Sequence, residues 1–132
     1  MVLKFTISTN EKQSFTNLDQ YLDKALIDSG VREGIMVVYC PHTTAAITIN
    51  ENADPDVKTD LKRGLDETFP NKADYVHMEG NSDGHMKSTV VGASETLIIS
   101  DGQLIMGTWQ SVYFCEFDGP RTRTVHVKIK EG

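Results

Sequence analysis

The fold class is predicted from residues 95–130, ETLIISDGQLIMGTWQSVYFCEFDGPRTRTVHVKIK. They contain three stretches rich in β-branched and aromatic residues, at 95–100, 111–117 and 122–130. Asp101-Gly102 predicts a tight hairpin turn that brings 103–106 back beside the first of these strands, and Asp118-Gly119-Pro120 predicts a second turn. Strands that follow one another through short turns, without helical crossovers, pair antiparallel. The sequence therefore predicts a largely antiparallel sheet.

The first part of the chain adds helices to this sheet. Alternating apolar residues predict a strand at 2–9, which forms a hairpin with 13–15. Apolar residues at helical spacing predict a helix from Asn17 to Gly30. Asp54-Pro55, a capping carboxylate followed by proline, starts a second helix that runs to Phe69. Strands at 34–40 and 46–50 and a short helix at 85–91 complete the set.

These elements predict an α+β fold with mostly antiparallel sheets and two main helices packed on them. The length of 132 residues suits a single domain, 1–132. The predicted core consists of Phe5, Ile7, Leu22, Leu26, Val37, Ile47, Leu61, Leu97, Ile99, Ile105 and Phe114.

Composition narrows the classes of function. The net charge of −6 argues against general nucleic-acid binding, which depends on clustered lysine and arginine. No apolar run approaches the ~20 residues that span a bilayer. The strand-like start lacks the apolar core of a signal peptide, so we expect a cytoplasmic protein. The one basic cluster, around Arg121 and Arg123, is either a local anion contact or a solvated strand face.

Histidines provide the first candidate site. His42 follows a strand and Pro41, and His77 and His85 flank the polar segment 79–84. Neutral imidazole is a common metal ligand, and three histidines with an open position suit catalytic zinc. Locally hydrogen-bonded loop histidines are the alternative, because no compact ligand pair is present. His126 lies in an alternating strand, where we expect it to face solvent opposite the valines.

Carboxylates near these histidines are candidate general bases or partners that orient an imidazole. They are Glu51, Asp54, Glu79, Asp83 and Glu116. Helix capping already accounts for Asp54. Glu116 lies in an apolar strand and needs a partner if it is buried, so an ion pair with Arg121 or Arg123 is the alternative to catalysis.

Two further features have both functional and structural interpretations. The segment Gly107-Thr108-Trp109-Gln110-Ser111 carries a ring and an amide that suit a heterocyclic ligand, or it forms a bulge with Trp109 in the core. Cys40 and Cys115 lie in apolar stretches and are predicted to be buried free thiols.

Four ordered blocks resemble the YjbQ family, whose members are described as secondary thiamine-phosphate synthase enzymes. The blocks are His42–Asp54, Glu79–Ser88, Gly107–Gln110 and Cys115–Arg121, and the resemblance covers essentially the whole chain. It implies a compact α+β domain, a homotrimer, and a metal ion bound by His42, His77 and His85. Gly84 stands where the family commonly has alanine, a departure that predicts a looser loop.

The reaction implied by the resemblance joins a pyrimidine pyrophosphate to a thiazole phosphate and releases pyrophosphate. Lys87 and Arg121, with the metal, would bind the leaving group, and Trp109 with Gln110 would bind the pyrimidine. Glu51, Glu79 and Glu116 are the candidate catalytic carboxylates. Zinc suits the histidines, whereas magnesium, which favours oxygen ligands, would suit this reaction.

Three hypotheses follow. The first is a metal-dependent enzyme acting on a small phosphorylated heterocyclic substrate, with thiamine-phosphate synthesis as its named instance. The second is a metal-dependent hydrolase in which a histidine-bound water is the nucleophile and Glu51 or Glu79 is the base. The third is a non-catalytic module that binds a metal or small ligand, and whose fold the metal would stabilise.

Overall fold

The computed structural model describes residues 1–132 and contains two antiparallel sheets. The five-stranded sheet has the order β1-β8-β3-β5-β6 and the three-stranded sheet the order β2-β7-β4. The strands are β1 (Val2–Ser8), β2 (Ser14–Asn17), β3 (Gly34–Tyr39), β4 (Ala45–Glu51), β5 (Ser94–Ser100), β6 (Gln103–Leu104), β7 (Gln110–Glu116) and β8 (Thr122–Glu131). All strand pairs are antiparallel.

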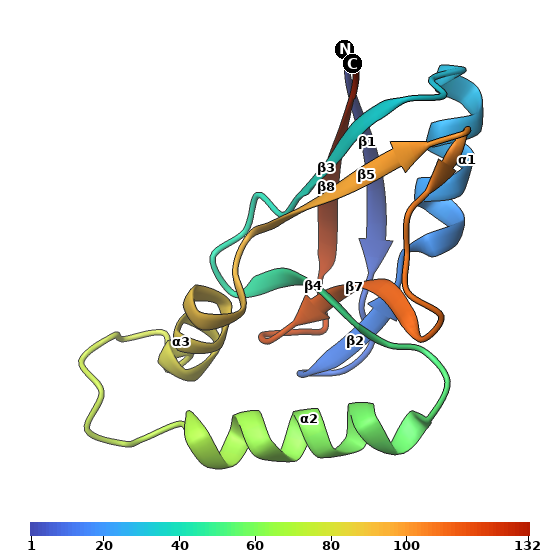
Figure 1. The fold of residues 1–132 in the computed structure, drawn as a ribbon. Helices are drawn as coiled ribbons and strands as arrows, with labels where there is room; N and C mark the ends of the chain where they lie inside the picture. Colours follow the sequence, from blue (N-terminus) through green and yellow to red (C-terminus); the bar gives the residue numbers. More distant parts are fainter.

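Three helices accompany the sheets, and the predicted α+β class is confirmed. They are α1 (Asp19–Ser29), α2 (Pro55–Thr68) and α3 (Ser82–Val91). Figure 1 shows α1 beside the larger sheet, α2 running along the opposite end of the molecule, and α3 near one end of α2. The two chain termini lie side by side at the end of β1 and β8.

The helix boundaries follow the local signals. Gly30 ends α1 in the left-handed conformation, at φ 69°. Asp54 caps α2 by accepting a hydrogen bond from the Asp56 N–H at 2.9 Å, with Pro55 as the first helical residue. The third helix begins at Ser82 rather than at 85, so His85 lies on a helix and not at its start.

The main core lies between α1 and the sheets. Of the predicted core, seven residues are buried: Ile7, Leu22, Leu26, Ile47, Leu97, Ile99 and Phe114. Phe5, Val37 and Leu61 are only partly buried. Ile105 is 55% exposed, because it lies opposite Ile98, which is 59% exposed, and donates its N–H to the Ile98 carbonyl oxygen at 2.8 Å. Both cysteines are free and buried, as predicted, and burial raises the pKa of each thiol.

The predicted hairpin of 2–9 with 13–15 does not form. β1 pairs with β8 in the larger sheet, whereas β2 pairs with β7 in the smaller one. The Asp118-Gly119-Pro120 turn likewise carries the chain from β7 in the smaller sheet to β8 in the larger. Local turn signals mark where a strand ends, but they do not determine whether the next strand pairs with it. The consequence is that chain crossings between sheets surround the candidate site.

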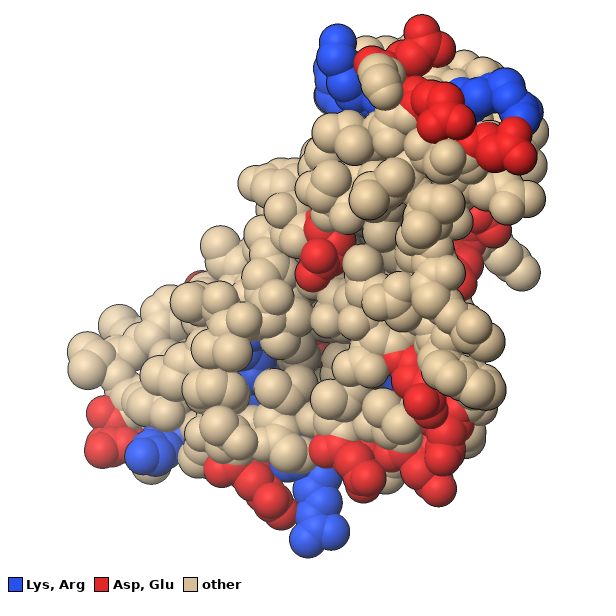
Figure 2. Space-filling view, in the orientation of Figure 1, with Lys and Arg blue, Asp and Glu red and all other residues tan.

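On the face that Figure 2 shows, charged side chains lie mainly at the upper end and along the lower edge. Acidic and basic side chains are mixed at both places, and fewer charges lie between them. None of the helices is long and apolar enough to cross a membrane. His126 lies opposite buried Val125 and Val127, as the strand alternation predicts, and it is half-buried beside Tyr39, with ring centroids 6.4 Å apart.

Candidate functional site

A polar cavity of about 350 Å³ lies where the chain passes between the two sheets. One side is Pro41–Thr44, which joins β3 to β4, and another is the segment after β7 that leads into β8. The 77–81 segment and α3 close it. The cavity is lined by Pro41, His42, Thr43, Thr44, His77, Glu79, Asn81, His85, Asp118, Arg121 and Arg123, without a hydrophobic side chain.

Buried Arg123 lines this cavity and is paired with Glu116, which is fully buried and does not line it. Glu116 Oε1 accepts hydrogen bonds from Arg123 Nε at 2.9 Å and from Thr9 Oγ1 at 2.7 Å. Glu116 Oε2 accepts from Asp118 N–H at 3.0 Å and from Arg123 Nη2, which also donates to Thr44 Oγ1 at 2.9 Å. Burial by itself raises the pKa of Glu116, but the hydrogen bonds from Arg123 and Thr9 outweigh it and hold the pKa below its ordinary value.

Glu116 therefore has a structural role in this arrangement. Its side chain is fully buried, and both oxygens are occupied by donors of the protein itself. The predicted alternative, an ion pair with an arginine, is realised with Arg123. Glu116 fixes the guanidinium in the cavity wall and leaves Nη1 without a hydrogen bond inside the protein.

A strand of the larger sheet holds His42 in one orientation. Its Nε2 accepts a hydrogen bond from the backbone N–H of Thr124 at 2.9 Å. A backbone N–H can only donate, so the proton of the neutral imidazole must be on Nδ1. Burial and the nearby Arg123 guanidinium lower the pKa of His42, which favours this neutral form.

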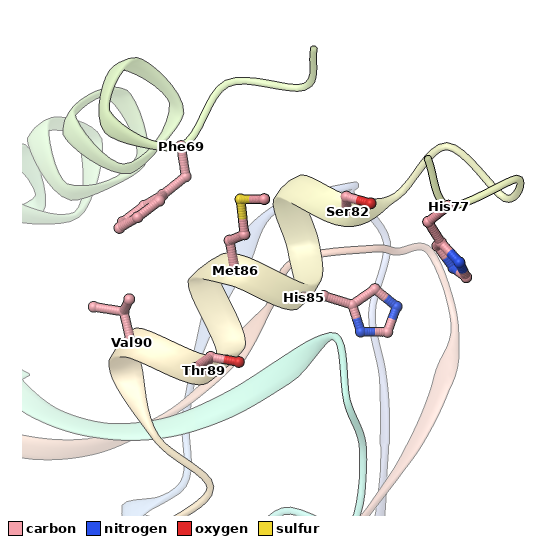
Figure 3. A pocket seen from close by; sticks show the side chains of 7 residues that line it. All are labelled: Phe69, His77, Ser82, His85, Met86, Thr89 and Val90. Atoms are coloured by element: carbon pink, nitrogen blue, oxygen red, sulfur yellow. The ribbon is translucent and has the colours of Figure 1, made fainter. Parts of the chain in front are cut away.

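His77 and His85 face each other across the edge of the cavity. Their ring centroids are 5.2 Å apart and the rings are perpendicular. Figure 3 shows His85 projecting from α3 toward His77, which lies on the preceding loop. Gly84 positions this helix: a Cβ at Gly84 would lie 2.9 Å from the Phe117 carbonyl oxygen. Gly84 thus allows close packing of α3, and the predicted loosening of a loop does not apply to this helical, buried position.

The three histidines line one cavity but do not form a three-histidine metal centre as arranged. No group of three or more His, Cys, Asp or Glu side chains is placed to hold one metal ion. The lone pair of His42 Nε2 is used by Thr124, and protonated Nδ1 has none to offer. Binding of a divalent ion, zinc or magnesium, stays a prediction.

Asp118 links the arginine side of the cavity to α3. Its Oδ2 accepts hydrogen bonds from Arg121 Nη2 at 2.8 Å and from Asn81 Nδ2 at 2.7 Å. Asn81 is the N-cap residue of α3, so the positive end of the helix dipole lies at the cavity. Glu79 lines the same cavity, and it is exposed.

The other predicted site residues lie elsewhere. Lys87 is buried, and its Nζ bonds Asp66 Oδ1 at 2.5 Å and Gln13 Oε1 at 2.7 Å. This lysine joins α3 to α2 and is not open to a leaving group, so the predicted contact with pyrophosphate is not available.

Glu51 and Trp109 line a separate cavity with Asp54, at the start of α2. Trp109 is 61% exposed, which contradicts the alternative that it fills the core. Gln110 Oε1 accepts the Gly107 N–H at 2.8 Å and closes the turn around Trp109.

Sequence patterns underestimated three members of the site. Arg123 was considered only as part of a basic cluster or as an ion-pair partner of Glu116. Asn81 was placed in the polar segment 79–84 and Asp118 in a turn. The signal available for Arg123 was its alternation with Val125 and Val127, which places it on the buried face of β8. A buried arginine needs an acceptor, and Glu116 was the carboxylate in the adjoining apolar strand.

Comparison with known proteins gives a consistent assignment. The family model of UPF0047 protein YjbQ-like matches residues 3–132. The UPF0047 protein of Methanocaldococcus jannaschii is 50% identical over 98% of this chain and 94% of its own length. The UPF0047 protein YugU of Bacillus subtilis is 49% identical over 98% of both chains.

Solved structures of related proteins share this fold. A YjbQ/UPF0047 protein of Clostridium acetobutylicum, described as uncharacterized, is 50% identical, with a TM-score of 0.95 over 97% of this chain and 99% of that one. A Sulfolobus solfataricus protein described as of unknown function has the same TM-score at 26% identity, over 100% of this chain and 97% of that one. The chain belongs to the YjbQ (UPF0047) family.

Proposed function

We propose that the polar cavity is the active site of an enzyme that acts on a small phosphorylated heterocyclic substrate. The observation that carries the proposal is the pair of guanidinium groups, Arg121 and Arg123, in a cavity with three imidazoles and no hydrophobic side chain. Arginine suits phosphate because its planar donors match two phosphate oxygens. The N-terminus of α3 adds further positive potential to the same cavity.

Each side chain then has a defined part. Arg123 is held by Glu116 and offers Nη1 to a phosphate oxygen, and Arg121 offers the donors that Asp118 does not use. Neutral His42 donates from Nδ1, as a hydrogen-bond donor that needs no positive charge. His77, His85 and Glu79, which line the same cavity, would transfer protons.

Thiamine-phosphate formation is the named reaction to test. The thiazole nitrogen would form a bond to the methylene carbon of the pyrimidine, while the carbon–oxygen bond to pyrophosphate breaks and pyrophosphate leaves with the electron pair. Arg121 and Arg123 would stabilise the charge that develops on the leaving group. A divalent ion, if bound, would supply further charge neutralisation there.

The test uses two measurements on the purified full chain. Calorimetric titration with pyrophosphate measures binding to the cavity, and an assay with both thiamine precursors, with and without divalent ions, measures product. We expect pyrophosphate binding that Arg121→Ala weakens at least tenfold, the equivalent of ~1.4 kcal/mol for one lost charge-assisted contact. Absence of pyrophosphate binding would refute the cavity's role, whereas binding without product would refute only the named reaction.

We further propose that the chain assembles as a homotrimer through the uncovered face of the larger sheet. Four apolar side chains on or beside this face are exposed: Val2 at 56%, Ile35 at 41%, Tyr39 at 46% and Ile98 at 59%. Several exposed apolar side chains on one sheet face are typical of a subunit interface. Light scattering should give three times the 14.7 kDa monomer mass, and Ile98→Glu should lower it; a monomeric wild type would contradict the proposal.

A further inference from the structure

A second cavity, of about 450 Å³, shares His77 and His85 with the polar cavity but has different chemistry. Its apolar wall consists of Phe69, at the end of α2, and Met86 and Val90 on α3. Figure 3 shows Phe69, Met86 and Val90 on one side of this region and His77 and His85 on the other. Ser82 and Thr89 supply its remaining polar groups.

The helix explains why two unlike cavities meet here. Met86 and Val90 are four residues apart on α3 and therefore share one face. His85, the neighbour of Met86, points about 100° away around the helix axis and lines both cavities. A ligand bound against Met86 could extend past His85 into the polar cavity and reach its arginines.

The apolar wall is not explained by the packing of the chain. Phe69 and Met86 are only half-buried, and Val90 is 62% exposed. An aromatic ring and a flexible methionine side chain that stay open to solvent can cover the two faces of a flat ligand. Ligand sites combine apolar walls with a few directed polar groups, as these two cavities do together.

We infer that the cavity between Phe69 and α3 is the subsite for the ring of the substrate. This inference rests on the proposed function, in which the adjoining polar cavity binds the phosphate. It defines the substrate class as a small planar ring joined by a short link to a phosphate or pyrophosphate. The ring lies against Phe69 and Met86, the phosphate lies on Arg121 and Arg123, and His85 lies at the junction. Trp109, which lines another cavity, does not take part.

Inorganic phosphate and phenyl phosphate are the probes, each titrated into the full chain. We expect phenyl phosphate to bind about twentyfold more tightly than inorganic phosphate. This factor follows when the typical affinity per non-hydrogen atom of drug-sized ligands is applied to the six ring carbons. Phe69→Ala should remove most of this difference and leave the affinity for inorganic phosphate unchanged. Ile27→Ala is the control, because it removes an exposed apolar side chain of α1 outside both cavities, and it should change neither affinity.

The outcomes separate this inference from the function on which it rests. If inorganic phosphate binds and phenyl phosphate binds no more tightly, the ring subsite is refuted and the phosphate site stands. If neither binds, both fail. If Phe69→Ala lowers the mass of the assembly without changing the affinity ratio, Phe69 belongs to a subunit contact and the subsite is refuted.

A second variant guards against a loss of folding in Phe69→Ala. Val90→Asp changes a surface residue of α3, so the fold should persist, and it places a negative charge in the proposed subsite. We expect it to abolish the preference for phenyl phosphate. An unchanged preference in Val90→Asp would refute the subsite whatever the Phe69 variant does.

Discussion

Replacing Glu116 by glutamine tests the buried pair that it forms with Arg123, a residue of the cavity wall. The two side chains are 0% and 6% exposed, and each Glu116 oxygen receives two donors. A glutamine must put its NH2 group at one of those oxygen positions, where it meets donors instead of accepting from them. It also leaves Arg123 charged and buried without its partner. Breaking a buried pair from one side costs about 3–5 kcal/mol, out of a total stability of about 5–15 kcal/mol.

The assay is urea unfolding followed by far-UV circular dichroism, at the same protomer concentration for each variant. The matched control is Glu67→Gln, which breaks the exposed ion pair with Arg63 at 2.9 Å and should cost less than ~1 kcal/mol. If Glu116→Gln lowers the free energy of unfolding by less than ~1 kcal/mol, the stabilising role of the Glu116–Arg123 pair is refuted. The double change Glu116→Met with Arg123→Met should cost less than the two single changes together, because no unpaired charge remains.

The pH dependence of stability checks His42. Because its pKa is lowered in the folded state, the unfolded chain binds more protons, so stability falls as pH falls below the ordinary value of 6.5. His42→Gln keeps an acceptor for the Thr124 N–H but does not titrate, so between pH 7 and pH 5 it should lose less stability than the wild type. An equal loss in both proteins would contradict the lowered pKa of His42. Nitrogen-15 NMR should show the His42 proton on Nδ1. Added zinc should leave that signal unchanged, and a zinc-induced shift would show that His42 binds the metal. Gly84→Ala should lower the unfolding free energy by about 1–3 kcal/mol, as overpacking does, because its Cβ meets the Phe117 carbonyl oxygen at 2.9 Å; a thermal midpoint equal to wild type would show that α3 can shift. Lys87→Met should lower stability without changing the affinity for pyrophosphate, and a weaker pyrophosphate affinity would return Lys87 to the site.

Local sequence signals determined much of the secondary structure. Asp54-Pro55 and Gly30 fixed helix ends because each acts on backbone groups within a few residues. Alternation along β8 separated buried Val125 and Val127 from half-buried His126, because successive strand residues point to opposite faces. Such signals need no knowledge of the rest of the chain.

Pairing between distant segments could not be obtained from these signals. The same turn residues serve a hairpin and a crossing between sheets, so the predicted hairpin of β1 with β2 was wrong. The motif predicted Lys87 as a phosphate ligand, but its partner Asp66 lies on α2, 21 residues earlier in the chain. Exposure of Ile105 depended on its position opposite Ile98, whose side chain is also exposed.

For the candidate site, the amino-acid sequence identified the chemical groups that were available: the three histidines, the arginines after Pro120 and the carboxylate in β7. Their roles depended on the three-dimensional arrangement. Glu116 pairs with Arg123 across two strands of different sheets. His42 Nε2 accepts a hydrogen bond from the backbone N–H of Thr124, which is 82 residues away. The physical reason is that imidazole and carboxylate roles depend on which atoms meet their lone pairs, and chain crossings between the sheets bring those atoms together.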